Sequence, residues 1–250
     1  MIPTKSPKEI QKMRDSCAIV AKAFKELEKH IKIGISTKEL DAIAESFILS
    51  CGAKPSFKGY RGFPASSCIS VNDVVIHGIP NAGRILKDGD IVSIDLGALK
   101  DDFHGDAART FAVGNISKEA ARLIDVTKEC FFEGLRQARA GRRVGDISNA
   151  VQIHAERFGF SVVRNYTGHG IGRKLHEDPS IPNYGATGTG AILKAGYCLA
   201  IEPMINQGDF KTTLDADKWT VRTADGSLSA HYENTVLITH TDPEILTILQ

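Results

Sequence analysis

Apolar residues recur at steps of three and four positions near the start of the chain, which predicts a long amphipathic helix. The stripe ends at Gly34 and consists of Ile10, Met13, Cys17, Val20, Phe24, Leu27 and Ile31. This spacing places the apolar side chains on one helix face, toward a core. Ser6-Pro7-Lys8-Glu9 reads as a capping box with proline at the first helical position, so the helix should begin there.

A second helix and a group of strands should follow. Ser36-Thr37-Lys38-Glu39 is another capping box, and the apolar positions behind it predict a helix that closes near Gly52. Runs of β-branched and apolar residues predict strands at 68–72, 74–77, 90–98 and 103–113.

The second half of the chain resembles the first at an offset of 107 residues. Helical patterns cover 117–139 and 145–158, and a strand pattern follows at 160–166. The offset relates Phe24 to Phe131, Gly34 to Gly141, Leu40 to Ile147 and Gly52 to Gly159. The duplication predicts a pseudo-symmetric α+β domain in which two helix pairs pack on one curved antiparallel sheet.

Late strands are predicted at 198–206 and, across an Asp225-Gly226 hairpin turn, at 220–223 paired with 229–239. No linker-like or low-complexity stretch divides the chain, and 250 residues suffice for one well-buried core. We therefore expect a single domain over residues 1–250.

Composition narrows the class of protein. A hydrophobic content of 42% and a charged content of 24% are ordinary for a globular protein, and the net charge of +1 gives no general attraction to nucleic acid or membrane. No apolar run reaches the ~20 residues of a membrane span, and the N-terminus lacks the apolar stretch of a signal peptide. Five cysteines without a C-x-x-C pair argue against disulfides and a structural zinc, so we expect a cytoplasmic protein.

Four acids and one imidazole in apolar or glycine-rich surroundings form the most informative chemical pattern. They are Asp95, Asp106, His169, Glu202 and Glu233. Buried carboxylates without partners are costly. Oxygen ligands together with one nitrogen suit Mn, Fe, Co or Zn. The pattern therefore favours a metal-dependent hydrolase.

The strands that carry Asp95 and Asp106 are joined by Lys100-Asp101-Asp102. A turn centred between Lys100 and Asp101 would place the two acids opposite each other, with Cβ atoms about 5 Å apart, where a cation would offset their repulsion. Alternatives stay open at this point. The two acids could flank a turn in solvent, His169 could be a loop histidine without special role, and Glu202 and Glu233 could occupy solvent-facing strand positions.

Other motifs are weaker. The glycine-rich stretch 185–190 lacks the spacing of a phosphate-binding loop and is expected to be a plain loop. No G-x-S-x-G or H-E-x-x-H motif occurs. The basic cluster of Arg139, Arg142 and Arg143 is expected to be a solvated face, or alternatively a contact for ribosomal RNA.

Together these features resemble the methionine aminopeptidases, specifically the short bacterial type I form. The similarity runs along nearly the whole chain. Its most telling segments are Cys68-Ile69-Ser70-Val71-Asn72, Val75-Ile76-His77-Gly78-Ile79-Pro80, Leu86-Lys87-Asp88-Gly89-Asp90, Gly168-His169-Gly170-Ile171-Gly172 and Ile201-Glu202-Pro203-Met204. The resemblance implies the pita-bread α+β fold with an internal pseudo-twofold.

The resemblance also implies a dinuclear metal centre. Asp106 and Glu233 would bridge two divalent ions (Co, Mn, Fe or Zn), Asp95 would chelate one of them, and His169 and Glu202 would complete the other. Two such ions can acidify a water and polarise the scissile carbonyl. Glu202 would also act as the general base for that water.

Substrate contacts follow from the same resemblance. His77 and His176 would flank the substrate and steady the tetrahedral intermediate. An apolar pocket for the methionine thioether would include Tyr60, Phe63, Cys68, Leu175 and Trp219. Phe57, Phe63 and Leu175 differ from the residues of better-known bacterial members, which leaves the chemistry intact but bears on selectivity.

The implied activity is hydrolysis of the initiator methionine from nascent polypeptides with a small second residue. The implied protein is a cytoplasmic monomer that acts on nascent N-termini, touches the ribosome transiently and binds neither DNA nor membrane. One alternative is a prolidase or Xaa-Pro aminopeptidase of the same fold, which usually carries an additional N-terminal domain. The other is a non-catalytic pita-bread module that binds peptides or ribosomes.

Overall fold

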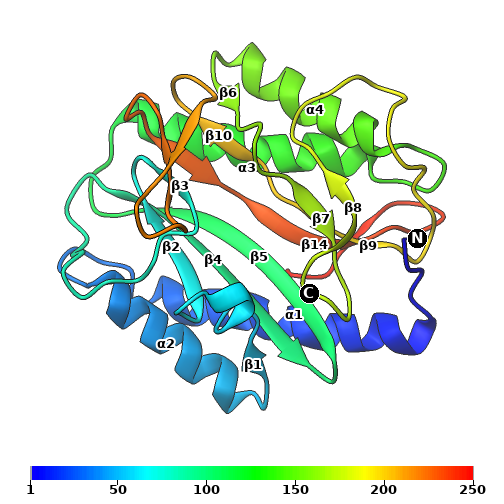
Figure 1. The fold of residues 1–250 in the computed structure, drawn as a ribbon, viewed down its shortest axis with the longest axis horizontal. Helices are drawn as coiled ribbons and strands as arrows, with labels where there is room; N and C mark the ends of the chain where they lie inside the picture. The colour runs from blue at the N-terminus through cyan, green and yellow to red at the C-terminus, as the bar shows by residue number, and fades with distance from the viewer. Residues whose placement is uncertain (1, 250) are drawn as a thin grey trace.

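The computed structural model describes residues 2–249 and shows two helix pairs packed on a curved antiparallel sheet (Figure 1). The helices are α1 (Pro7–Glu28), α2 (Thr37–Ser50), α3 (Lys118–Gln137) and α4 (Val144–Arg157). The strands are β1 (Lys54–Pro55), β2 (Ser67–Val71), β3 (Val74–Ile76), β4 (Ile91–Lys100), β5 (Phe103–Ala112), β6 (Ser161–Val162), β7 (Gly168–Gly170), β8 (Glu177–Ile181), β9 (Cys198–Ile201), β10 (Met204–Asn206), β11 (Thr212–Leu214), β12 (Val221–Thr223), β13 (Ser229–His231), β14 (Glu233–Leu237) and β15 (Glu244–Ile245). A 3₁₀ turn, η1, covers Tyr60–Gly62. Within residues 2–249, no helix is long and apolar enough to cross a membrane.

The helices begin where the sequence predicts. The Ser6 side chain accepts a hydrogen bond from the Glu9 amide, and the Glu9 carboxylate accepts one from the Ser6 amide at 3.0 Å. Ser36 and Glu39 form the same box at α2. The first helix is shorter than predicted, since α1 ends at Glu28 and Gly34 lies in the following turn with φ +92°, a conformation that favours glycine. The strand predicted at 160–166 is reduced to the two residues of β6.

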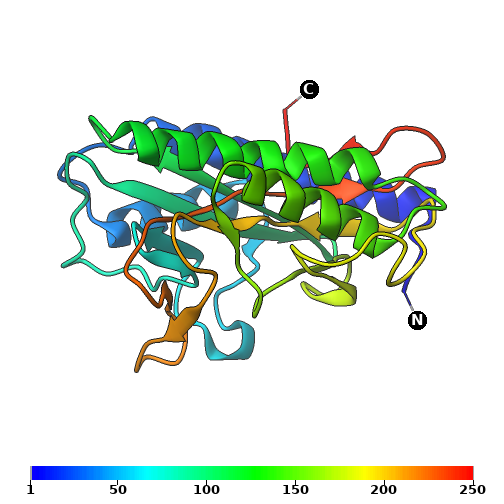
Figure 2. The same cartoon turned by 90° about the horizontal axis from the view of Figure 1, so that it is seen from above.

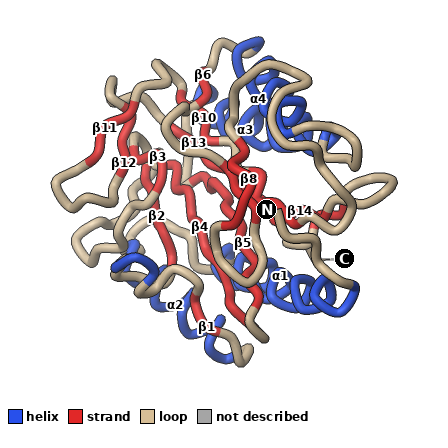
Figure 3. The backbone as a smooth tube through the Cα atoms, turned by 45° about the vertical axis from the view of Figure 1, so that its right-hand side comes forward, coloured by secondary structure: helices blue, strands red, loops and turns tan. Residues whose placement is uncertain are grey.

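The main sheet runs in the order β1-β4-β5-β14-β9-β7-β8, with β2 added to β4 and β15 to β14. Two smaller sheets have the orders β13-β10-β6 and β11-β12-β3. Figure 3 shows β3, β11 and β12 together at one side of the molecule, next to β2. β3 contacts β2, which pairs with β4, so this small sheet extends from the β4 side of the main sheet.

The predicted hairpin across Asp225-Gly226 is wrong. β12 pairs with β11 and β3, whereas β13 pairs with β10. The Asp225 carboxylate accepts hydrogen bonds from the amides of Asp209 and Ser227. These bonds hold the turn against the loop before β11. The strands on either side of the turn, β12 and β13, therefore enter different sheets.

The internal repeat is confirmed by matching backbone contacts. An isolated bridge joins Ser36 to Ile85, and a second joins Arg143 to Ile192, each residue 107 positions after its counterpart. The amide of Gly34 donates to the carbonyl of Leu86, and that of Gly141 donates to Leu193 at the same 2.9 Å. The halves therefore share their backbone conformation, and the same offset relates Asp95 to Glu202.

The β4–β5 hairpin separates the helix layer from the other side of the sheet (Figure 2). Ile94 and Leu96 point toward α1 and α2, where they pack in a cluster with Phe24 and Leu40. Because successive side chains of a strand point to opposite faces, Asp95 points away from the helices. The fold thus fixes which face of β4 can carry a polar site.

Helix α1 lies very close to β5 at Gly105. A Cβ atom built there would lie 2.7 Å from the amide nitrogen of Cys17 and 2.8 Å from its Cα. Contacts this short with a helix backbone cannot be relieved by a side-chain rotation. The glycine is needed for close packing between helix and hairpin.

We expect Gly105→Ala to lower the free energy of unfolding by about 1–3 kcal/mol, as overpacking does. Urea unfolding of the metal-free protein measures this change. Gly83→Ala is the control, because a Cβ at exposed Gly83 meets only the side-chain oxygen of Asn81 at 3.2 Å; it should change stability by less than about 0.5 kcal/mol. Equal stability of Gly105→Ala and wild type would contradict the packing argument.

Candidate active site

Asp95 and Asp106 point to the same face of the β4–β5 hairpin, but their predicted register is wrong. Asp95 lies opposite Ala108, and Asp106 lies opposite Gly97. The turn is formed by Asp101 and Asp102, both with left-handed φ values of +49° and +67°. Aspartate tolerates this conformation. The turn therefore shifts the register by two residues, which preserves the face of every side chain.

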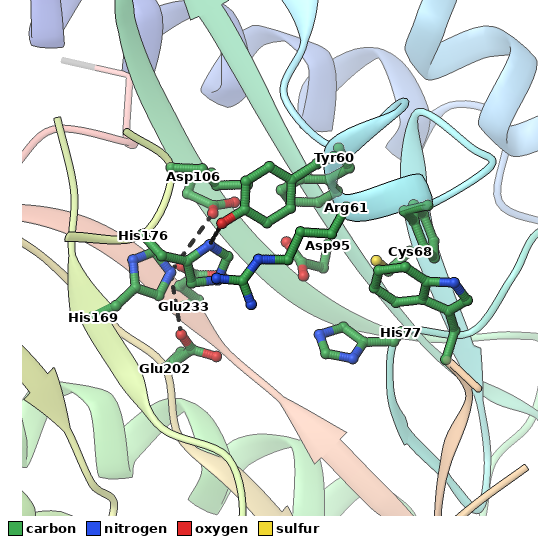
Figure 4. A pocket seen from close by; sticks show the side chains of 14 residues that line it. Tyr60, Arg61, Cys68, His77, Asp95, Asp106, His169, His176, Glu202 and Glu233 are labelled. Atoms are coloured by element: carbon green, nitrogen blue, oxygen red, sulfur yellow. Dashed lines mark hydrogen bonds and ion pairs between the residues drawn. The ribbon is translucent and has the colours of Figure 1, made fainter. Parts of the chain in front are cut away.

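The other three predicted metal ligands converge on the same place (Figure 4). Glu233 opens β14 and lies opposite Ala108 of β5. His169 lies in β7 beside Ala200, and Glu202 directly follows β9. One donor atom each of Asp106, His169 and Glu233 lie within 4.8 Å of one another. His169 Nε2 is 4.0 Å from Asp106 Oδ2 and 3.5 Å from Glu202 Oε1.

The carboxyls of this cluster are buried without enough partners. Burial raises the pKa of Asp95 to about 7 and raises the pKa of Asp106, Glu202 and Glu233 well above their usual range. Three of their oxygens have no hydrogen-bond partner within residues 2–249, namely Asp95 Oδ1, Asp106 Oδ1 and Glu233 Oε1. Such atoms cost free energy unless a proton or a cation satisfies them.

His169 presents an unprotonated ring nitrogen to the acids. Burial lowers its pKa to about 3. Its Nδ1 lies 2.9 Å from the Gly170 carbonyl, which can only accept, so Nδ1 carries the proton. The lone pair on Nε2 therefore faces the acids. A neutral imidazole fixed by a backbone carbonyl, together with carboxylate oxygens, fits a first-row divalent cation.

A cavity of about 140 Å³ contains the acids in its lining and has an apolar wall beside them. All five predicted pocket residues line it: Tyr60, Phe63, Cys68, Leu175 and Trp219. Phe57 lines it too, and the Phe63 and Trp219 rings meet edge to face at 5.2 Å. The structure thus places an apolar wall and the cluster of acids in one cavity.

His77 and His176 line the same cavity as the acids, with His176 beside His169 and His77 on the side of Cys68 (Figure 4). His176 Nδ1 is 2.9 Å from the Tyr60 hydroxyl, and its ring centroid is 4.2 Å from that of His169. His77 has φ +59°, a strained backbone for a non-glycine residue. Burial lowers the pKa of His77 to about 4 and also lowers that of His176. Both rings are therefore neutral at neutral pH.

Sequence reasoning missed two residues of this site. His231 is buried, with Nε2 3.6 Å from Glu202 Oε2, and Arg61 lines the cavity mouth. His231 precedes Glu233 by two residues, a spacing that would have placed both on one face of a continuous strand. Arg61 offered no pattern, because its place depends on the 3₁₀ turn η1 and its own left-handed φ of +48°.

The buried acids and one imidazole that the sheet gathers have the donor set of a metal-dependent enzyme. Residues 11–240 match the sequence model of Metallopeptidase family M24. The methionine aminopeptidase of Clostridium perfringens is 56% identical over 250 residues, and methionine aminopeptidase 1 of Bacillus subtilis is 54% identical over 247 residues. These alignments cover 100% and 99% of both chains. The chain therefore belongs to the methionine aminopeptidases of family M24.

Solved structures agree with this assignment. The crystal structure of the methionine aminopeptidase from Thermotoga maritima superimposes with a TM-score of 0.98 at 43% identity, covering 100% of both chains. The prolidase from Pyrococcus furiosus has a TM-score of 0.81 at 24% identity and is covered only over 66% of its chain. The prolidase likeness shows the shared pita-bread fold alone.

We expect the metal-free Asp95→Asn variant to become more stable relative to the metal-free wild type as pH rises from about 4 to about 7. The Asp95 pKa is raised in the folded state, so the unfolded chain ionises first and wild-type stability falls across this window. Asparagine at position 95 has no carboxyl to ionise, so the variant does not lose stability in this way. Thermal unfolding of chelator-treated proteins across the window measures the difference.

With saturating Mn²⁺, the wild type should instead be more stable than Asp95→Asn. A ligand that binds only the native state stabilises it by mass action. The neutral amide of the variant would hold the ion less well than a carboxylate does. A constant stability difference at all pH values, with and without the ion, would contradict the buried-carboxyl site.

Proposed function

We propose that this chain is a metal-dependent aminopeptidase that removes N-terminal methionine from polypeptides with a small second residue. One observation supports this most strongly: within residues 2–249, buried carboxyl oxygens without partners and an apolar wall line the same cavity of about 140 Å³. A cation site facing an apolar wall suits cleavage next to an apolar terminal side chain. The relatives named methionine aminopeptidase support the same substrate.

We propose that the site holds two divalent ions. Asp95, Asp106, His169, Glu202 and Glu233 would hold them. Four carboxyls and one imidazole offer more donor atoms than a single ion of four to six ligands uses, which supports two. Co, Mn, Fe and Zn all accept this set. When bound, the ions acidify a water and polarise the scissile carbonyl.

The protein side chains then handle protons and position the substrate. Glu202 would act as the general base, since its carboxylate lies within the ligand cluster, with Oε1 3.5 Å from His169 Nε2. We assign the Tyr60 hydroxyl, 2.9 Å from His176 Nδ1, as the donor of this hydrogen bond. The proton of His176 would then lie on Nε2, from which it would donate to the substrate carbonyl. His77 donates to the peptide from the cavity side. Neutral rings suit this role, because they stabilise developing negative charge without holding a carboxylate in an ion pair.

The cavity walls select the terminal side chain. Cys68 and Leu175 are buried, and Phe63 and Trp219 offer ring edges to a thioether sulfur. Such contacts contribute about 0.3–1.5 kcal/mol. Phe57, Phe63 and Leu175 are the positions where this chain sets its own fine selectivity.

We also propose the wider setting of this activity. Residues 1–250 form a single catalytic domain that works as a monomer in the cytoplasm on nascent polypeptide N-termini, with transient ribosome contact and without DNA or membrane binding. The full-length alignments with the short bacterial relatives support the domain proposal. The near-neutral net charge of +1 supports the absence of general DNA or membrane binding.

We expect Glu202→Gln to abolish turnover of Met-Ala-Ser, by about 10³-fold or more, while the fold persists. Release of methionine from the metal-loaded protein measures turnover, and circular dichroism checks the fold. Lys118→Gln, on the exposed start of α3, is the matched control and should retain wild-type activity. Undiminished activity of Glu202→Gln would contradict the role of Glu202 as the general base.

Wild-type protein should release methionine from Met-Ala-Ser and leave Ala-Pro intact. Cleavage of Ala-Pro alone would favour a prolidase, and no cleavage of either peptide with bound metal would favour a binding module. Metal analysis of anaerobically purified protein should give about two ions per chain. These measurements test substrate and metal count separately.

We expect His176→Ala to lower kcat/KM for Met-Ala-Ser by about 10²–10⁴-fold, since it removes a donor to the reacting carbonyl. Steady-state kinetics of the metal-loaded enzyme measure the change. Metal content should remain that of wild type, because His176 is not among the proposed ligands. A loss of bound metal equal to the loss of activity would contradict the assigned role.

A further inference from the structure

The segment before α1 makes a buried ion pair with the far half of the chain. Lys5 Nζ lies 2.7 Å from Glu177 Oε2, and the two side chains are only 5% and 9% exposed. The ammonium also donates to the Pro3 carbonyl, and the Lys5 amide donates to the Gly196 carbonyl at 2.9 Å. In a buried pair each charge depends on the other, because removing one leaves the other desolvated and unpaired.

The Lys5–Glu177 ion pair packs against the backbone of the short loop between β7 and β8. Glu177 Oε1 accepts from the Lys174 amide, and the Gly172 amide donates to the Lys174 carbonyl. A Cβ atom at Gly172 would lie 2.6 Å from Lys5 Cε and 2.7 Å from Glu177 Oε1. The loop backbone therefore rests on the ion pair without intervening side chains.

This loop carries two residues of the proposed site. Leu175 is 2% exposed and lines the cavity. His176 is the neighbour of Glu177 in the chain, and it holds the Tyr60 hydroxyl at 2.9 Å. A shift of Glu177 must move His176, and small misplacements of a catalytic group reduce rates strongly.

We propose that Lys5 is a positioning residue that, through Glu177, fixes His176 and Leu175 against the substrate. The inference rests on the proposed function for the role of His176. It assigns a part in the reaction to a segment far outside the metal cluster in sequence. Figure 3 shows the N-terminal end of the chain next to β8, the strand that Glu177 opens.

The same loop offers a matched control. Arg173 pairs with Glu9 of α1 at 3.2 Å, but the two side chains are 58% and 29% exposed. Exposed pairs contribute little because water screens them. Arg173→Gln removes a tie between the same two segments without unpairing a buried charge.

We expect Lys5→Met to lower kcat/KM for Met-Ala-Ser about tenfold or more, mainly in kcat. Arg173→Gln should stay within about threefold of wild type, and Lys5→Arg should recover part of the loss. In the His176→Ala background, Lys5→Met should cause a smaller loss than in the wild type, because the part of its effect that acts through His176 is absent there. All variants are assayed metal-loaded and well below their unfolding temperatures.

The imidazole NMR signals of His176 give a readout independent of turnover. They should shift in Lys5→Met and remain unchanged in Arg173→Gln. Glu177→Gln, which keeps an oxygen for the Lys174 amide, is the second variant if Lys5→Met does not fold, with the same expected outcomes.

Three results would overturn the inference: wild-type kcat in Lys5→Met, an equal loss with and without His176, or unshifted His176 signals. Failure of the proposed function appears differently, as an inactive wild type whose His176 signals still respond to Lys5→Met.

Discussion

Repulsion among carboxyls confined to a buried space is the constraint on which the centre of this protein depends. Asp95, Asp106, Glu202 and Glu233 reach one place from β4, β5, the end of β9 and the start of β14. The neighbouring histidines cannot balance these acids, because burial keeps them neutral. Arg109 donates to the carbonyls of Ala108 and Glu233 and to the Asn234 side chain, so its donors are occupied by neutral groups. Added cations are the natural means of keeping all four carboxyls ionised.

The internal duplication explains how one sheet can supply such a cluster. The offset that matches the backbone contacts of the two halves also matches Asp95 with Glu202, so each half contributes one acid from an equivalent position. The remaining parts are asymmetric. The first half supplies the long β4–β5 hairpin with Asp106, and the second supplies His169 and the loop that carries His176. The site lies where the halves meet, and residues of both halves line its cavity.

Much of the site could be predicted from the sequence, although not for geometric reasons alone. The metal-ligand candidates stood out because acids in apolar strands need a partner, and the pocket residues came from the family resemblance. The predicted pairing register of Asp95 and Asp106 was wrong by two residues, because the left-handed φ values of Asp101 and Asp102 place the turn there. The conclusion about their shared face survived, because a two-residue shift does not exchange faces.

The sequence by itself determined the features that depend on neighbours a few residues apart. The capping boxes at Ser6 and Ser36, the apolar stripe of α1 and the halves of the repeat all follow from local hydrogen bonds and helical spacing. Only the tertiary structure decided the partners of β12, the unpartnered carboxyl oxygens and the contact of Lys5 with Glu177. These depend on distances between segments far apart in the chain, and no local pattern encodes such distances.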